Sequence, residues 1–366
     1  MIKHNAENER IKRTYFIFLK EAKRQNESSV DAVAKAISRF EFYTKYRNFK
    51  VFHFQQAVAF KADLAQQNNQ QTGKKLSKAT LNSTLRQLKT FFQWLAMQSG
   101  YKSRISYTDT EYFNLSEKEV RVATARREKS VPTLQQIKHV IDAMPTKSAI
   151  DRRNRGLMAF TILTGARDSA IASMKLKHID IAGNKVFQDA REVNTKFSKT
   201  FTTFFFPVGG DIEQIVVDWV RYLKEELLYG NDDPLFPKTN VITGKNRTFQ
   251  ASGLKHEHWS NASPIRAIFK EAFESADLPY FNPHSFRDTL VMFGETLCQS
   301  PEEFKSWSQN LGHDNVLTTF TSYGVVQHQR QGEIFKQLKS PREVMPPNVT
   351  ELAKALAYEM RSNKSL

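Results

Sequence analysis

The sequence has little cysteine and no long apolar segment. Cys298 is the only cysteine among 366 residues, which excludes an internal disulfide and any metal site built from several cysteines. We interpret it as a small buried apolar residue. The most apolar run, residues 157–163, is far shorter than the roughly 18 residues that a membrane-spanning helix needs. The first residues, MIKHNAENER, lack the apolar stretch of a secretory signal, so we expect a cytoplasmic protein that binds no membrane.

Several enzyme motifs are also missing. The chain has no HExxH zinc motif, no G-x-S-x-G nucleophile elbow and no Walker-type phosphate loop. His256 and His258 lie at strand spacing with no third ligand nearby in the sequence, so we expect no metal site there. We therefore expect no metal, no other cofactor and no small-molecule substrate.

Positive charge is abundant and unevenly distributed. The formal net charge is +16 and the pI is near 9.7, which is typical of proteins that bind a polyanion, most often nucleic acid. Residues 1–125 hold 22 Lys and Arg against 11 Asp and Glu, a balance of +11; residues 126–366 hold 32 against 27, a balance of +5. We expect the N-terminal third to be the electrostatic clamp. The alternative is a basic surface that serves only solubility.

The N-terminal region predicts a helical domain. From Glu9 to Leu95, apolar residues recur at spacings of three and four, with almost no proline. Ser77 is a candidate N-cap for a helix that ends near Gly100. Its apolar stripe contains Leu81, Leu85, Leu88, Phe92 and Leu95. We interpret the aromatic side chains around this stripe, Phe91, Phe92 and Trp94, as core. The charged stretch that follows, residues 101–129, indicates an interdomain linker.

A second domain is predicted from about residue 131. Thr133 and Gln136 form a capping-box signature. Residues 178–208 have a strand-like pattern, with Lys196 and Lys199 on a hairpin turn and Phe204–Phe206 in a buried strand. Helical patterns occupy much of the rest, near residues 150–164, 212–228, 264–276 and from 284 onward.

Two short motifs place cations at helix starts. In "NPHSFRDT", Asn282 suits an N-cap and Pro283 the first helical position, which puts His284 and Arg287 on one face of the first turn. A helix N-terminus with an arginine favours a phosphate, although a capped surface helix with incidental charges is the alternative. In "TGARDSA", Arg167 follows a buried run and needs an anion or a structural ion pair, for which Asp168 is the obvious partner.

The two hairpin lysines and a C-terminal motif complete the set. Lys196 and Lys199 are either solvated turn residues or donors that reach into a groove. In "LGHDNVLTTFTSYG", His313 precedes Tyr323 by ten positions, about 15 Å along a straight helix. Together these side chains suit phosphoryl transfer without metal, because arginines and histidines can neutralise phosphate oxygens while tyrosine forms a covalent intermediate.

At this point the chain resembles the tyrosine recombinase (phage integrase) family over roughly residues 30–340. "TILTGARDSAIASMKLKHID" resembles the first-arginine box, "PHSFR" the His-x-x-Arg box, and "LGHDNVLTTFTSYG" the box that ends in the nucleophile. The resemblance implies a multidomain fold, with a mainly α, SAM-like core-binding domain and a mixed α/β, mostly helical catalytic domain with a small β-sheet or hairpin. We expect these segments as follows: core-binding domain 1–115, with 1–30 a candidate separate extension, linker 116–130, catalytic domain 131–340 and tail helix 341–366.

The resemblance also implies a role for each side chain. Arg167 and Arg287 would grip the scissile phosphate, His284 would assist proton transfer, His313 would hydrogen-bond a phosphate oxygen, and Tyr323 would attack. The general acid would be Lys196 or Lys199. We favour Lys196 because it lies in the "NTK" stretch where the first strand turns, while the eight-residue distance from Lys199 to Pro207 keeps Lys199 open.

Two positions depart from the family pattern. Ala170 stands where the family usually has an acidic residue, three positions after the first arginine, so Arg167 would need another support such as Asp168. The gap of ten between His313 and Tyr323 is one more than the commonest nine, which implies a small insertion or bulge.

The expected activity is site-specific recombination of double-stranded DNA through a 3′-phosphotyrosyl intermediate, without ATP or metal. Family resemblance implies a homotetramer on two DNA sites that integrates or excises a mobile element, nucleoid-associated if the source is bacterial. Two alternatives stay open: strand cleavage of the type IB topoisomerase kind, and a DNA-binding protein with a decayed site.

Overall fold

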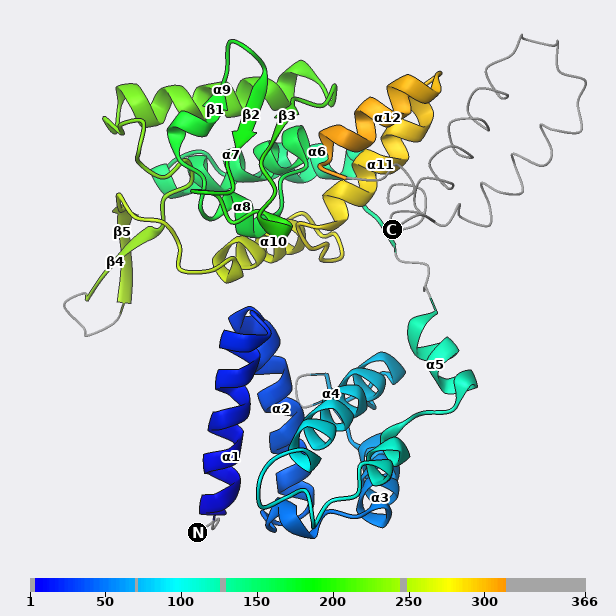
Figure 1. The fold of residues 1–366 in the computed structure, drawn as a ribbon. Coiled ribbons are helices and arrows are strands. Elements are labelled where there is room, and N and C mark those ends of the chain that lie inside the picture. Colours follow the sequence, from blue (N-terminus) through cyan, green and yellow to red (C-terminus); the bar gives the residue numbers. More distant parts are fainter. Residues whose placement is uncertain (1–3, 70–71, 126–129, 244–248, 314–366) are drawn as a thin grey trace, which may run out of the picture. The chain divides into compact units, whose positions relative to one another are not determined.

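The computed structural model describes residues 4–69, 72–125, 130–243 and 249–313. The chain divides into two compact units, Met1–Arg127 and Glu128–Leu366, and each has its own hydrophobic core (Figure 1). Among the described residues, no helix is long and apolar enough to cross a membrane.

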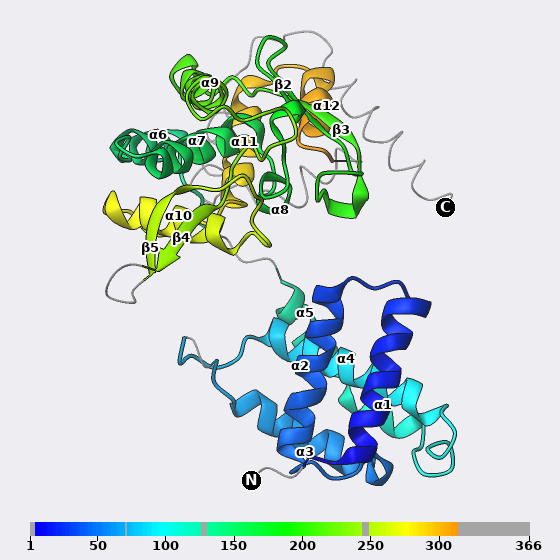
Figure 2. The same ribbon diagram turned by 90° about the vertical axis from the view of Figure 1, so that its left-hand side faces the viewer.

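The first unit is helical, as the apolar spacing predicts. Its helices are α1 (Ala6–Ile17), continued by a π-helical turn (Phe18–Ala22), α2 (Glu27–Tyr43), α3 (Phe54–Gln66), α4 (Lys78–Ala96) and α5 (Glu117–Thr124), with short 3₁₀ turns at Phe49–Val51 and Thr108–Phe113. Figure 2 shows α1 and α2 running side by side. The helix α4 packs against α2, and its apolar stripe forms much of the core.

Local signals determine where α4 begins. The Ser77 side chain accepts a hydrogen bond from the Thr80 amide at 3.1 Å, which confirms the predicted N-cap. The rings of Phe91 and Phe92 are fully buried, and Trp94 packs at the edge of the same core. The interpretation of these aromatics as core is therefore confirmed.

The expected linker contains an ordered helix. Residues 117–124 form α5, which begins with a capping box between Ser116 and Glu119. Lys78 of α4 forms an ion pair with Glu119 at 2.9 Å, so α5 packs on α4. The first unit therefore continues past residue 115, up to Arg127. The charged composition concealed this helix because α5 has no buried residue.

The second unit combines helices with two small antiparallel sheets. Its elements are α6 (Leu134–Ala143), α7 (Ala149–Thr164), α8 (Asp168–Ile171), β1 (Ile179–Asp180), β2 (Lys185–Gln188), β3 (Phe201–Phe204), α9 (Gly210–Glu225), β4 (Thr239–Thr243), β5 (Phe249–Leu254), α10 (Ser263–Ser275), α11 (Ser285–Leu297) and α12 (Pro301–Asn310). The sheet order is β1-β2-β3, and β4 pairs with β5. The capping box of Thr133 and Gln136 opens α6 as predicted.

The core of the second unit centres on α7. Its second half is buried on every side, and it packs along α9. Gly156 permits this close approach, because a Cβ there would lie 2.8 Å from Cγ of Trp219 on α9. A buried α7 places its C-terminal end, and the residues that follow, in the interior of the unit.

The predicted buried strand at Phe204–Phe206 is partly wrong. Phe204, the last residue of β3, is 58% exposed, whereas Phe206 is buried. The Phe206 amide donates to the Leu163 carbonyl of α7 at 2.8 Å. The chain therefore leaves the edge strand at Phe204 and turns into the core two residues later.

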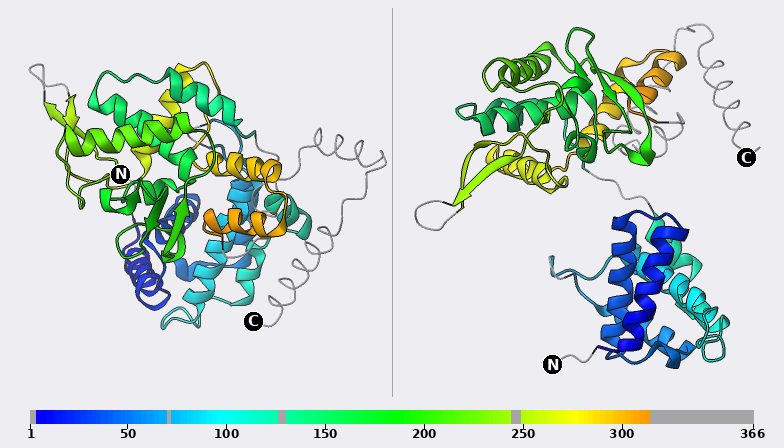
Figure 3. Two further views of the ribbon diagram at one scale, coloured as in Figure 1. Left: turned by 90° about the horizontal axis from the view of Figure 1, so that it is seen from above. Right: turned by 60° about the vertical axis from the view of Figure 1, so that its left-hand side comes forward.

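The β4–β5 hairpin was not predicted. It extends away from the body of the second unit (Figure 3), and neither strand has a buried face. Its base is held by Arg153 of α7, whose guanidinium donates to the Pro237 carbonyl at 2.8 Å and to Thr239 Oγ1 at 3.2 Å. An exposed ribbon lacks the alternation of apolar and polar residues that marks a half-buried strand.

Candidate active site

The site begins at the junction between α7 and α8. The buried helix α7 ends at Gly165, which adopts a left-handed conformation with φ 59°. A Cβ at Gly165 would lie 3.0 Å from methyl carbons of both Leu290 and Leu311, so glycine also lets α11 and the end of α12 approach. Arg167 follows as the N-cap residue of α8, half-buried.

Arg287 ties this junction to two other segments. It lies in the first turn of α11 and is 2% exposed. Its Nη1 donates to the Gly165 carbonyl, and its Nη2 donates to the Leu311 carbonyl at 2.6 Å and to Nε2 of His313 at 3.1 Å. One guanidinium thus joins the ends of α7 and α12 to the start of α11.

His313 is held just after α12. Gly312 precedes it with φ 71°, and a Cβ at Gly312 would lie 2.7 Å from the Phe201 ring of β3. The His313 amide donates to the Ser308 carbonyl at 3.2 Å, and the side chain is 5% exposed. Because only glycine allows this turn and approach, "LGH" is positioned against both α11 and β3.

The electrostatics of His313 show which side chains gather around it. The pKa of His313 is lowered to about 3, chiefly by burial and then by the electrostatic effects of Arg287, Arg167, Lys199 and His284, in that order. The imidazole is therefore neutral at neutral pH. Since Arg287 donates to Nε2, the ring proton lies on Nδ1, which makes His313 a neutral hydrogen-bond donor.

The structure thus brings five of the predicted residues together, from four separate segments of the chain. They are Arg167, Lys199, His284, Arg287 and His313. Tyr323 lies outside the described residues.

The two candidate lysines differ in their surroundings. Lys199 is half-buried, and its charge acts on His313. Lys196 is exposed, with its ammonium 4.8 Å from the centre of the Phe197 ring. Phe197 and Ser198 between them have left-handed backbone angles, φ 60° and 51°, so the chain turns sharply from one lysine to the other.

The start of α11 differs slightly from expectation. Asn282 Oδ1 accepts hydrogen bonds from the amides of His284 and Ser285, at 3.0 and 3.3 Å, so it stabilises the turn that leads into α11. The N-cap residue of α11 is His284 rather than the predicted Asn282. The α-helix proper begins at Ser285, two residues later than expected. His284 is consequently exposed while Arg287 is buried, and both still act on His313.

Comparison with known proteins identifies the family. Residues 131–330 match the sequence profile described as the phage integrase family. The chain belongs to this family, the tyrosine recombinases. It is a site-specific DNA recombinase, and the matched region contains every predicted site residue.

Curated relatives support this assignment. The chain is similar to tyrosine recombinase XerC of Lactobacillus delbrueckii subsp. bulgaricus, with 22% identity over 251 residues that cover 68% of this chain and 72% of the relative. Tyrosine recombinase XerC of Halalkalibacterium halodurans is also 22% identical, over 247 residues that cover 66% of this chain and 70% of the relative.

Solved structures share the fold. A lambda integrase (75–356) dimer bound to a COC′ core site superposes with a TM-score of 0.58 and 12% identity, covering 93% of this chain and 99% of that one. The Tn1549 transposon integrase in complex with transposon right end DNA gives a TM-score of 0.54 with 13% identity, covering 90% and 99%. The predicted fold class, a helical domain plus a mostly helical catalytic domain with small sheets, is confirmed.

In this recombinase the support expected for Arg167 is not an ion pair with Asp168. Asp168 instead accepts from Nε of Arg266 on α10, at 2.8 Å. The expected pair of Arg167 and Asp168 was wrong because Asp168, the first residue of α8, forms its ion pair with Arg266, 98 positions away. Ala170, at the position of the usual acidic residue, is buried.

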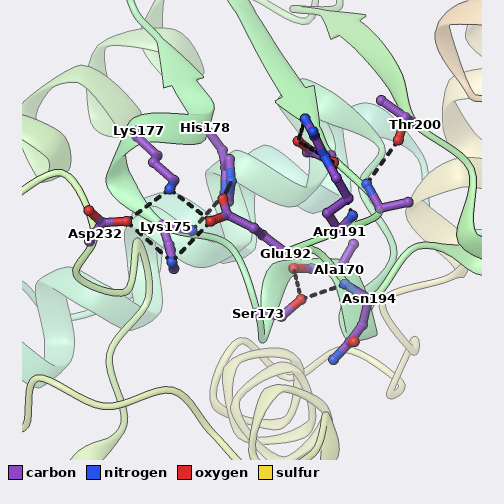
Figure 4. A network of polar contacts seen from close by, with 12 residues as sticks. Ala170, Ser173, Lys175, Lys177, His178, Arg191, Glu192, Asn194, Thr200 and Asp232 are labelled. Atoms are coloured by element: carbon purple, nitrogen blue, oxygen red, sulfur yellow. Dashed lines mark hydrogen bonds and ion pairs between the residues drawn. The ribbon is translucent and has the colours of Figure 1, made fainter.

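Sequence reasoning missed a polar network beside the recombinase site. Glu192 contacts Lys175, Lys177 and His178, and Asp232 contacts the two lysines (Figure 4). Hydrogen bonds from Lys177 and then His178 lower the pKa of Glu192 to about 2, so its carboxylate is ionised at neutral pH. The basic residues of "KLKH", near the end of the first-arginine box, were the available signal. Among the described residues, no cluster of His, Cys, Asp and Glu could hold a metal ion.

Proposed function

We propose that Tyr323 attacks the scissile phosphate of double-stranded DNA and forms a 3′-phosphotyrosyl bond. The bond from phosphorus to the 5′-oxygen breaks, and that oxygen leaves as a hydroxyl after receiving a proton. Attack by the 5′-hydroxyl of a partner strand reverses the step and restores the tyrosine. The proposal is supported chiefly by one observation: neutral His313, ten positions before Tyr323, lies among the side chains of Arg167, Lys199, His284 and Arg287.

In this proposal each side chain of the site has a separate role. Arg167 and Arg287 stabilise the negative charge that develops on the non-bridging oxygens. His313 donates its Nδ1 proton to one of those oxygens, a role supported by its fixed tautomer. His284, exposed at the start of α11, accepts the phenolic proton on its neutral imidazole as Tyr323 attacks. The tyrosyl ester retains the energy of the phosphodiester, so the cycle requires neither ATP nor metal.

We assign the general acid to Lys199. Its ammonium gives a proton to the 5′-oxygen, which is a poor leaving group as an alkoxide. The assignment is supported by the half-buried position of Lys199 and by its electrostatic effect on His313. Lys196, which the sequence favoured, is exposed and is the alternative.

We further propose that the enzyme acts as a homotetramer on two DNA sites, in the cytoplasm and at the nucleoid of a bacterial cell. Integration or excision of a mobile element is the role that we favour, because a similar fold occurs in the Tn1549 transposon integrase in complex with transposon right end DNA. Truncation after Ser340 should then weaken synapsis of two sites more than binding to one site, as measured by sedimentation. Unchanged synapsis would count against a role of residues 341–366 in assembly.

Trapping the covalent intermediate tests the chemistry. A suicide DNA substrate, nicked so that the short fragment with the new 5′-hydroxyl diffuses away, should yield a denaturant-resistant adduct with the wild-type protein. Tyr323→Phe removes only the phenolic oxygen, so it should abolish the adduct and leave DNA affinity nearly unchanged. Tyr107→Phe, at an exposed tyrosine of the first unit, is the control and should form the adduct normally. An adduct that persists in Tyr323→Phe would show that another residue is the nucleophile.

A further inference from the structure

The loop that carries both lysines is fastened to α8. Residues 189–200 connect β2 to β3, and Asn194 lies in their middle. The Asn194 amide donates to Ser173 Oγ at 2.8 Å, and the Asn194 carbonyl accepts from Ser169 Oγ at 3.2 Å (Figure 4 shows the first contact). Both backbone polar groups of Asn194 are therefore held by hydroxyls, one from Ser169 in α8 and one from Ser173, two residues beyond its end.

The Ser173 hydroxyl is itself oriented by α8. It donates to the carbonyls of Ala170 and Ser169, at 3.1 and 3.2 Å. With its proton directed at the helix, its oxygen lone pairs face the Asn194 amide. The segment that begins with Arg167 thus provides the loop with an oriented hydrogen-bond acceptor, the Ser173 hydroxyl, which is itself bonded to the carbonyl of buried Ala170.

Two further contacts limit how the loop can move. His178 Nδ1 accepts from the Lys175 amide at 3.0 Å, so its Nε2 carries the proton and donates to Glu192 at 3.0 Å. On the other side, Thr200 Oγ1 accepts from the Ala190 amide at 3.0 Å. The loop is fixed at residues 190, 192, 194 and 200, and the segment 195–199 between the last two of these points contains both lysines.

We propose that Ser173, assisted by Ser169, is a positioning residue for the general acid. By fixing Asn194, the two serines set where Lys199 can deliver its proton, and they link the loop to the turn that also presents Arg167. They do so at the turn where Ala170 replaces the acidic residue usual in the family. This inference rests on the proposed function, because it requires a hairpin lysine to be the proton donor.

A sulfur-bridged DNA substrate separates proton delivery from other roles. Replacing the bridging 5′-oxygen with sulfur makes the leaving group a thiolate, whose conjugate acid has a pKa of about 8.5, so that it departs without a proton. Ser173→Ala should slow single-turnover cleavage of ordinary DNA about 10- to 100-fold, the cost of a general acid displaced by about an ångström. On sulfur-bridged DNA the same variant should cleave within about threefold of wild type.

The comparison is insensitive to partial misfolding. Each variant is measured on both substrates, and the ratio of its two rates does not depend on the fraction of active enzyme. Ser173→Thr retains the hydroxyl and should keep the wild-type ratio. Ser252→Ala removes a serine oxygen that also accepts a hydrogen bond, from Asn240 Nδ2 at 3.0 Å, but on β5, and should change neither rate. An equal loss on both substrates in Ser173→Ala would overturn the inference.

Lysine variants keep the two proposals apart. Lys199→Ala should be slow on ordinary DNA and rescued by sulfur, whereas Lys196→Ala should show no selective rescue. Rescue of Lys196→Ala instead would overturn the assignment of Lys199 but not the positioning role of Ser173, if Ser173→Ala is also rescued. Rescue of neither lysine variant would remove the loop from proton transfer and overturn both proposals.

Discussion

The two units bury their polar side chains in different ways. In the first unit, Asn8 donates to Glu41 at 3.3 Å and to the Arg47 carbonyl at 2.9 Å, and Glu41 in turn accepts from Lys12 at 2.6 Å. These buried groups neutralise one another and fasten α1 to α2. In the second unit, the Nη atoms of buried Arg287 donate to two carbonyls and a neutral imidazole. In the first unit a buried carboxylate is thus neutralised by an ion pair, whereas in the second a buried guanidinium joins the ends of three chain segments.

The hydrophobic cores of the two units also differ in composition. Aromatic rings dominate the first unit: Phe52 stacks on Phe92 with centroids 4.0 Å apart, and both contact Phe113. The core of the second unit is mainly aliphatic around α7, and its polar site lies where several chain segments end. We therefore expect the first unit to depend on ring packing and the second to couple its stability to the site.

Removing the central arginine should have the largest effect. Arg287→Ala deletes the proposed phosphate contact and leaves the Gly165 and Leu311 carbonyls without this donor, each at a cost of about 1–3 kcal/mol in stability. We expect covalent-complex formation to slow about 10³- to 10⁵-fold, the range for a transition-state arginine. Arg287→Lys keeps the charge but loses the planar fork of the guanidinium, so it should recover only a small part of the wild-type rate of covalent-complex formation. A tenfold effect or less would refute the central role of Arg287.

The charge balance makes the next prediction. Residues 1–125 carry +11 and residues 126–366 carry +5, so the first fragment alone should bind DNA with the steeper salt dependence. Each phosphate contact releases counterions, and about six contacts would reduce affinity about 10³-fold between 50 and 200 mM salt. Fluorescence anisotropy with both fragments would measure the two slopes. Equal affinities and equal slopes would contradict the idea that the first unit is the electrostatic clamp.

A core truncation tests the aromatic half of the comparison. Phe92→Ala should destabilise the first unit by about 3–5 kcal/mol, because it leaves a cavity among rings that have little freedom to collapse. Urea denaturation should show this loss in the transition of the first unit, with the second unit unchanged. Phe42→Ala removes the same side chain from a site that is 67% exposed, and should cost less than about 0.5 kcal/mol. A similar loss in both variants would show that ring packing is not the source of stability.

The features that the sequence predicted well are the local ones. The Ser77 cap, the α4 stripe and the Thr133 capping box depend on residues within a few turns of one another, so spacing alone identifies them. The site motifs were recognisable for the same reason, since His284 with Arg287 and His313 after Gly312 are short-range patterns.

The features that the sequence did not predict depend on distant partners or on unusual backbone angles. Asp168 pairs with Arg266, and no local rule favours that choice over Arg167. Left-handed angles at Phe197 and Ser198 separate the environments of the two lysines, yet neither residue is a glycine that would signal such a turn. The serine contacts to Asn194 bridge 21 and 25 positions, and they become visible only when α8 and the loop lie together.

The pH dependence of stability is the smallest of these effects, and its sign follows from His313. An unfolded histidine has a pKa of about 6.5, whereas in the fold the pKa of His313 is about 3. Below about pH 6.5, His313 binds a proton in the unfolded chain but not in the folded chain, so the second unit should lose stability as the pH falls. The loss from this residue approaches about 1.4 kcal/mol per pH unit and is absent above the unfolded pKa.

Urea denaturation between about pH 7 and pH 5 would measure this slope, in a window above the lowered pKa, about 2, of Glu192 and Glu257. His313→Gln should flatten the pH dependence of the second-unit transition. Burial also lowers the pKa of His258, so a residual slope of the same sign should remain in that variant. His53→Gln, at an exposed position before α3, should retain the wild-type slope. Equal slopes for His313→Gln and the wild type would show that burial of neutral His313 does not reduce the stability of the second unit at low pH. The proposed coupling between the stability of this unit and its site would then fail at His313.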